Sequence, residues 1–170
     1  MERSLEQKAV ENLEAIQEMA DKLGYPTQVI SNEEITVPTM MLFVDDYDGE
    51  DIPISCSVIP MEVGGLGSLF LQYYTCIIDE IPQDKKEVIN EYIKRQNESF
   101  MIGNVLTFMD GVCLKYALYL DPDEPLDEVF IARALDIFTF EAKVLTEKIQ
   151  SIIDEKLDLE SALSTGAFYI

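Results

Sequence analysis

The sequence contains no histidine among its 170 residues. Histidine is the general base of Ser–His–Asp and Cys–His centres and the most frequent protein ligand of zinc and haem iron. Its absence excludes these centres and, with them, most familiar hydrolases. We therefore expect no catalytic residues, no metal site and no cofactor, and we predict that the chain is not an enzyme. Enzymatic activity would need a metal or cofactor held by carboxylates and thiols.

Basic residues are also scarce, because 12 Lys and Arg stand against 33 Asp and Glu, for a formal net charge of −21. Binding to phosphates needs a surplus of cations, so we expect no nucleic-acid partner. The longest uncharged run, Val63 to Ile78, is interrupted by glycines and is shorter than the roughly 18 apolar residues of a membrane span. The charged N-terminus does not follow the order of a secretory signal. We expect a cytoplasmic protein with no membrane partner.

Cysteine is rare as well, and its three positions, Cys56, Cys76 and Cys113, lie far apart in segments that resemble strands. Buried thiols in a reducing compartment are the simplest interpretation, because unpaired cysteine is among the most buried residue types. A reactive or metal-binding role is the alternative, although a metal site usually has more closely spaced cysteines.

The hydrophobic pattern changes period along the chain, and 48 % of the residues are hydrophobic, enough for a folded core. A capping box of Ser4 and Gln7 begins an amphipathic helix that Gly24 ends. Asp110-Gly111 is typical of a tight hairpin turn. The predicted helices are 4–23, 82–97 and 126–156, and the predicted strands are 27–30, 34–44 (with Pro38 at an edge or a break), 52–58, 69–78, 101–109 and 112–120.

This order, α-β-β-β-β-α-β-β-α, predicts an α+β fold, an antiparallel sheet with helices packed on one face. We expect one domain over residues 1–170, with 158–170 as a C-terminal tail that docks on it because it ends in apolar residues.

The stretch from Val88 to Ile149 resembles the YbjN family, whose domain has the type III secretion chaperone-like fold. The residues that carry the resemblance are Asn97, Ile102-Gly103, Leu106, Asp110-Gly111, Leu114, Tyr116, Leu118 and Asp121, with Leu23-Gly24-Tyr25 in the first half. The resemblance implies a small bacterial protein that forms a homodimer, lacks known catalytic residues and engages other proteins. The shared residues are fold-bearing positions, so the chaperone function is an analogy of fold.

Two loops have compositions that suggest ligands. The acidic loop 45–51 does not place oxygen ligands at the spacing of the calcium helix-loop-helix motif, so a solvated hairpin loop and a divalent-cation site are the alternatives. The glycine-rich segment 64–68 lacks the Lys-Ser or Lys-Thr pair of a phosphate loop. Its apolar residues Met61, Val63 and Leu66 suit either a binding lip over a groove or a loop tucked against its own domain.

The strand 69–78 has apolar residues on both faces, which carries our main functional hypothesis. Phe70, Tyr74 and Ile78 lie on the second face, and exposing them to water would forgo several kcal/mol of burial energy. Either a segment of the same chain or a partner must cover them. The leading hypothesis is a non-enzymatic interaction module, chaperone-like or regulatory, that binds itself as a homodimer and a client protein through Phe70, Tyr74, Ile78, Met61, Val63 and Leu66. The alternative is a small-ligand-binding protein with an apolar groove under the 60–67 loop.

Overall fold

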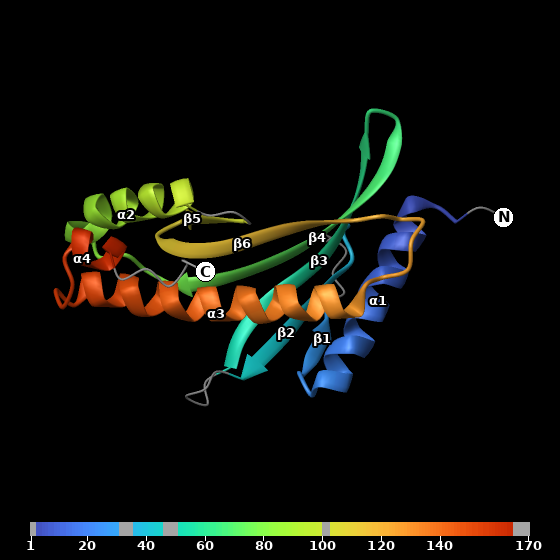
Figure 1. Ribbon diagram of the computed structural model, residues 1–170, viewed down its shortest axis with the longest axis horizontal. Coiled ribbons are helices and arrows are strands. Elements are labelled where there is room, and N and C mark those ends of the chain that lie inside the picture. Colours follow the sequence, from blue (N-terminus) through green and yellow to red (C-terminus); the bar gives the residue numbers. More distant parts are fainter. Residues whose placement is uncertain (1–2, 31–35, 46–50, 100–102, 165–170) are drawn as a thin grey trace. The chain divides into compact units, whose positions relative to one another are not determined.

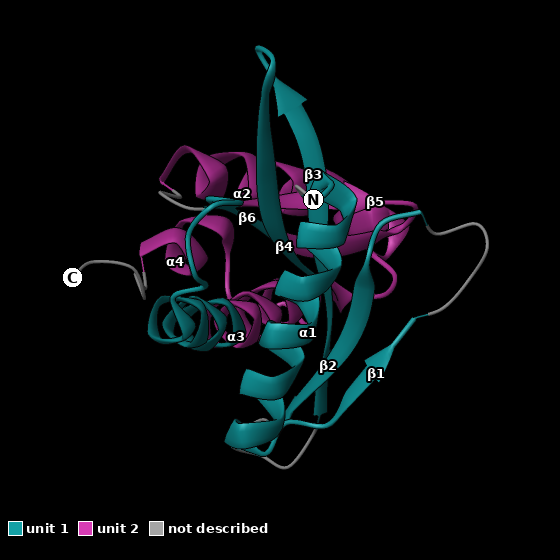
Figure 2. Cartoon of the chain, turned by 90° about the vertical axis from the view of Figure 1, so that its right-hand side faces the viewer, with its two compact units in different colours: residues 1–74, 116–139 teal, residues 75–115, 140–170 magenta. Residues whose placement is uncertain are grey.

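The computed structural model describes residues 3–30, 36–45, 51–99 and 103–164. The chain forms two compact units, each built from two segments (Figure 2). Unit 1 comprises residues 1–74 and 116–139, and unit 2 comprises residues 75–115 and 140–170. The first residues of the predicted strands 34–44 and 101–109, most of the acidic loop and the end of the tail lie outside the described residues.

The described elements form an antiparallel six-stranded sheet and four α-helices, which confirms the predicted α+β class and, up to the last long helix, the predicted order (Figure 1). Strands follow the order β1-β2-β3-β4-β6-β5. The elements are α1 (Leu5–Leu23), β1 (Thr27–Val29), β2 (Thr39–Asp45), β3 (Asp51–Val63), β4 (Leu66–Ile78), the 3-10 turn Gln83–Lys85, α2 (Lys86–Ser99), β5 (Asn104–Phe108), β6 (Gly111–Leu120), α3 (Glu128–Ile153) and α4 (Leu159–Ser164). The helix α4 lies in the segment predicted as a tail.

Local sequence signals set the bounds of α1 as predicted. Ser4 accepts a hydrogen bond from the Gln7 amide, and the Gln7 side chain accepts one from the Ser4 amide. Gly24 ends the helix in the left-handed conformation at φ 83°, which costs glycine little because it has no Cβ. The strand predicted across Pro38 begins only at Thr39, so Pro38 precedes β2 and does not interrupt it.

The core of unit 1 lies between its helices and one side of the sheet, which we call the covered face. Cross-strand register aligns Met40 with Cys56 and Cys56 with Tyr73, and all three are fully buried. Tyr73 packs against Phe138 of α3 with ring centroids 5.6 Å apart. The covered face consists of Met40, Leu42, Val44, Ile54, Cys56, Val58, Leu69, Leu71 and Tyr73. Figure 2 shows α1 running across these strands.

The hairpin between β5 and β6 forms where it was predicted, but glycine serves a different purpose there. Phe108 pairs with Gly111, so the two turn residues are Met109 and Asp110, and Met109 adopts the positive φ of 54°. A Cβ on Gly111 would lie 2.6 Å from the carbonyl oxygen of Ile78. Glycine is therefore required at position 111 because backbone approaches backbone, not because of the turn conformation that Asp110-Gly111 suggested.

Asn97 at the end of α2 occupies the outer edge of β5. Its side-chain nitrogen donates to the carbonyl of Val105 at 2.7 Å, and its side-chain oxygen accepts from the amide of Val105 at 2.8 Å. Val105 is buried, so both backbone groups would otherwise lack a partner. This pair of bonds gives a structural reason for asparagine at one of the positions that carry the family resemblance.

Replacing Asn97 by alanine should lower the free energy of unfolding by about 1–3 kcal/mol, because it leaves a buried amide and carbonyl unsatisfied. Chemical denaturation measures the change. Asn90→Ala is the matched control on the same helix, since Asn90 is exposed and should change stability by less than about 0.5 kcal/mol. Equal effects of the two substitutions would contradict this role for Asn97.

Candidate functional site

The candidate site is the side of the sheet opposite the covered face in unit 1, which we call the open face. The register pairs Val63 with Leu66, Met61 with Ser68 and Ile59 with Phe70, so these residues share one side of the β3–β4 ladder. Residues of the open face are Thr39, Met41, Phe43, Pro53, Ser55, Ser57, Ile59, Met61, Val63, Leu66, Ser68, Phe70, Gln72, Tyr74, Ala117 and Tyr119. Five of the six residues predicted to bind a partner, Met61, Val63, Leu66, Phe70 and Tyr74, therefore belong to one surface.

The segment predicted as the 60–67 loop is the tip of the β3–β4 hairpin. Only Gly64 and Gly65 form the turn, with φ of 63° and 81°, the conformation that a tight two-residue hairpin needs. The tip extends past the N-terminal end of α1 (Figure 2). Met61, Val63 and Leu66 are exposed there, and Leu66 is 74 % exposed. Gly64 and Gly65 thus turn the chain at the tip of a hairpin, and its interpretation as a lip over a groove stays a prediction.

Aromatic side chains occupy the middle of the open face. The ring of Phe70 contacts that of Tyr119 edge to face, with centroids 5.9 Å apart. Phe70 and Tyr74 are half-buried, whereas Tyr119 is 57 % exposed. Ile78, the sixth predicted residue, is only 8 % exposed and lies in unit 2. Alternation along β4 therefore holds for Phe70 and Tyr74 but does not bring Ile78 to an accessible surface.

Within unit 1, the open face carries no charge from the hairpin tip as far as Phe43 and its partner Pro53. Beyond that point the register pairs Asp45 with Asp51 on the same side of the ladder. On β6 the alternation that gives Tyr119 and Ala117 next reaches Lys115, which belongs to unit 2. Acids make up 33 of the 170 residues, so an uncharged surface across several strands departs from the rest of the chain. Large apolar surfaces of this kind are typical of protein interfaces.

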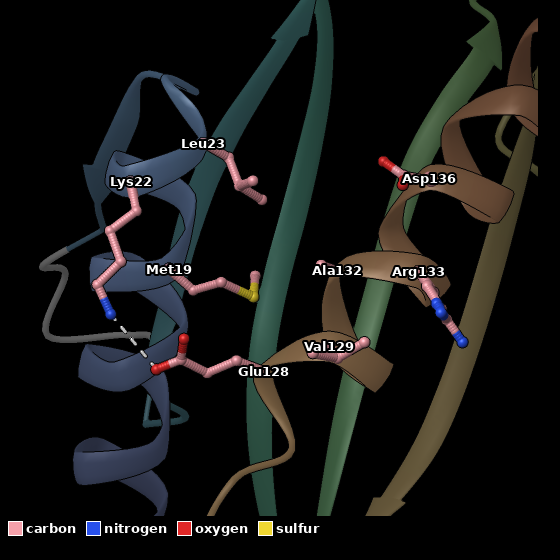
Figure 3. A pocket seen from close by; sticks show the side chains of 8 residues that line it. All are labelled: Met19, Lys22, Leu23, Glu128, Val129, Ala132, Arg133 and Asp136. Atoms are coloured by element: carbon pink, nitrogen blue, oxygen red, sulfur yellow. Dashed lines mark hydrogen bonds and ion pairs between the residues drawn. The ribbon is translucent and has the colours of Figure 1, made fainter.

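A second apolar surface of unit 1 is a groove between the end of α1 and the start of α3, with a volume of about 310 Å³ (Figure 3). Met19 and Leu23 point into it from α1, and Val129 lies on the α3 side. Its rim is charged, because Lys22 pairs with Glu128 at 3.4 Å, and Arg133 and Asp136 also line it. This charged rim distinguishes the groove from the open face.

Two further cavities in unit 1 have volumes of about 380 and 130 Å³. The larger lies between α1 and residues 29–30 and 36–39, and the smaller lies around residues 119–131. None of these three cavities is lined by residues of the hairpin tip. The alternative hypothesis of a ligand groove under 60–67 therefore gains no support from them.

The structure brings together two cysteines that the sequence places far apart. The sulfur atoms of Cys76 on β4 and Cys113 on β6 lie 2.8 Å apart in unit 2. Cys113 is buried as predicted, but Cys76 is exposed. Sequence reasoning missed this pair because β4 and β6 are sheet neighbours separated in the chain by α2 and β5. Cys56, by contrast, is buried on the covered face, and burial raises the pKa of its thiol.

Metal-binding clusters of three or more Cys, Asp or Glu side chains are absent from the described ranges. Residues 46–50 of the acidic loop fall outside those ranges, so its two interpretations stay predictions. Helices in the described part of the chain are not long and apolar enough to cross a membrane.

Glu141 on α3 is the acid with the most perturbed environment. It is 7 % exposed, and its Oε2 atom has no hydrogen-bond partner. Burial raises its pKa from 4.5 to about 7, since desolvation disfavours the charged carboxylate. A raised pKa in a cleft would suggest a general acid, but Glu141 lines none of the three cavities described above. We therefore regard it as a cost to stability and not as a catalytic group.

No family model matches the chain, and no curated protein matches it. The resemblance of Val88 to Ile149 to the YbjN family stays a prediction. Two of the residues that carry it, Asn97 and Gly111, have structural roles in unit 2, which agrees with their being fold-bearing positions.

Glu141→Gln should make the protein progressively more stable relative to wild type as pH rises. The pKa of Glu141 is about 7 in the folded chain, above its ordinary value of 4.5. Below about pH 4.5 the buried carboxyl is neutral and does not lower the stability of the wild type. As pH rises toward about 7, the unfolded chain ionises first, so the wild type loses stability. The difference in unfolding free energy between variant and wild type should grow by up to about 3 kcal/mol across this window. Denaturant titrations at several pH values measure it.

The matched control is Glu147→Gln on the same helix, because Glu147 is exposed. At neutral pH its stability difference from wild type should be smaller than that of Glu141→Gln, because the substitution removes no buried carboxylate. Comparing each variant with wild type cancels the contribution of the other acids. A pH-independent difference for Glu141→Gln would contradict the raised pKa.

Proposed function

We propose that the chain is a non-enzymatic interaction module that forms a homodimer through the open face of unit 1. The observation that carries the proposal is the uncharged surface, rich in aromatic and aliphatic side chains, in a chain of net charge −21. Burial of such surface is the main favourable term in protein association. A client protein bound on the same face is the second partner expected of such a module, which would act in the cytoplasm.

A dimer of micromolar affinity requires contacts over the whole open face. Full burial of a Phe, Leu, Met or Val side chain contributes about 1.5–3 kcal/mol, so residues that are already half-buried add roughly 1 kcal/mol each by the same measure. Micromolar affinity needs about 8 kcal/mol after the entropic cost of association. The hairpin tip alone, with Met61, Val63 and Leu66, is too small. Contacts at Phe70, Tyr74 and Tyr119 are needed as well.

Electrostatics favours a second copy of the chain on this face over other surfaces. In a two-fold symmetric dimer the same patch meets itself, so each carboxylate in the patch would enter the contact twice, once from each copy. The open face avoids this repulsion because it carries no acid between its tip and Pro53. Acids elsewhere are screened beyond about 8 Å at physiological ionic strength. The groove beside α3 lacks this advantage, since Glu128 and Asp136 line it.

The resemblance to the YbjN family supports the proposal independently of the open face. It implies a dimer without catalytic residues, and the absence of histidine from all 170 residues removes the commonest acid–base catalyst. Dimerisation through the open face can be tested without assuming membership of the family.

Tyr119→Glu should convert the dimer to a monomer, because each copy would bring a carboxylate to the centre of the symmetric contact. Tyr119 is 57 % exposed, so the folded subunit should tolerate the change. Ile137→Glu is the matched control, as Ile137 is 50 % exposed in the same unit but lies on α3, the helix that packs on the covered face through Phe138. Light scattering coupled to size-exclusion chromatography at micromolar concentration measures the mass, and we expect a dimer for wild type and Ile137→Glu only.

Salt provides a second criterion. Dimerisation through an uncharged face of an acidic chain should strengthen between low and physiological ionic strength, because screening reduces the remaining repulsion. An interface built on ion pairs would weaken. A wild-type monomer at tens of micromolar, or loss of the dimer by Ile137→Glu but not by Tyr119→Glu, would refute dimerisation through this face.

A further inference from the structure

Cys76 and Cys113 form a close pair of thiols whose proximity is built into unit 2. Their strands, β4 and β6, are neighbours in the antiparallel sheet. Facing residues on such strands have Cα atoms roughly 4.5–5.5 Å apart, within the range that a disulfide bridges. With the sulfur atoms 2.8 Å apart, a bond length of about 2.05 Å needs only a small displacement of the side chains.

The two thiols differ in accessibility in the way that a stepwise thiol–disulfide exchange requires. Cys76 is exposed and can meet a reagent in solution, whereas Cys113 is fully buried. The backbone around the pair is held in place, because the amide of Ile81 donates to the carbonyl of Asp110 at 2.7 Å. Gly111 also lies against the backbone of Ile78 and Asp79. Both strands are therefore fixed close to the sulfur atoms.

We propose that Cys76 and Cys113 are a redox-active dithiol that is oxidised reversibly by low-molecular-weight disulfides. The Cys76 thiolate attacks one sulfur of the reagent, which forms a mixed disulfide and releases one thiol. The Cys113 thiolate then attacks the Cys76 sulfur, which forms the Cys76–Cys113 bond and releases the second thiol. Two protein thiols are oxidised, one disulfide is reduced to two thiols, and the two protein protons pass to the released thiolates.

This inference is independent of the proposed dimer, because both sulfur atoms lie in the same chain and in unit 2. It also fits a reducing compartment, where disulfides are usually transient and catalytic or redox-sensing. The third thiol, Cys56, provides an internal standard. It is fully buried in unit 1, and its raised pKa disfavours the thiolate that exchange needs.

The test is incubation of the full chain with oxidised glutathione, followed by intact-mass measurement and peptide mapping. Wild type should lose two hydrogen atoms in mass, retain one thiol and yield a linked peptide containing Cys76 and Cys113, and dithiothreitol should reverse the change. Cys113→Ala should stop at a glutathione adduct on Cys76, because the resolving thiol is missing. Cys76→Ser should remain unmodified.

Cys56→Ser is the matched control and should behave as wild type. Wild type that keeps all three thiols in excess oxidised glutathione, accumulates the glutathione adduct, or forms only disulfides between chains would overturn the proposal. The wild-type result stands by itself, so the proposal stays testable even if a cysteine variant fails to fold.

Discussion

Tyr73 lies at the centre of unit 1, and its burial determines what both sides of the sheet do. Its ring packs on Phe138, which also contacts Tyr116 with centroids 5.0 Å apart, and its hydroxyl donates to the carbonyl of Ile131 at 3.4 Å. Successive side chains of a strand point to opposite faces. Once Tyr73 faces the helices, Tyr74 must face the other way, so the sealed core and the uncharged open face are two results of one constraint.

Much of this architecture follows from local signals, which sequence reveals well. The capping box at Ser4, the period of α1 and the alternation along β4 predicted elements that the structure confirms, because each depends on residues close together in the chain. At the hairpin tip, the amino-acid composition predicted the local structure less well than these signals did. Three glycines predicted a loop there, whereas only Gly64 and Gly65 turn the chain; Gly67 lies within β4, where a Cβ would come within 3.2 Å of Leu5.

The features that sequence did not reveal depend on contacts between distant segments. Tyr119 meets Phe70 and Cys113 meets Cys76 only because β6 lies beside β4, a pairing that skips α2 and β5. No period in the sequence encodes that register. Ile78 is a further example. Alternation along β4 predicts the side of the sheet on which Ile78 lies, but it does not predict that Ile78 is buried. The candidate site was thus predicted strand by strand, while its assembly across strands was not.

The amide of Asn97 has a consequence for how the chain behaves among its neighbours in a crowded cell. An outer strand with unpaired backbone groups is a template on which another polypeptide can add a strand, the first step toward fibrils. By occupying the amide and carbonyl of Val105, this side chain blocks such growth in the middle of β5. Spontaneous deamidation to aspartate would replace the donor with a repelling carboxylate, so chemical ageing at one position would reopen the strand to templated aggregation.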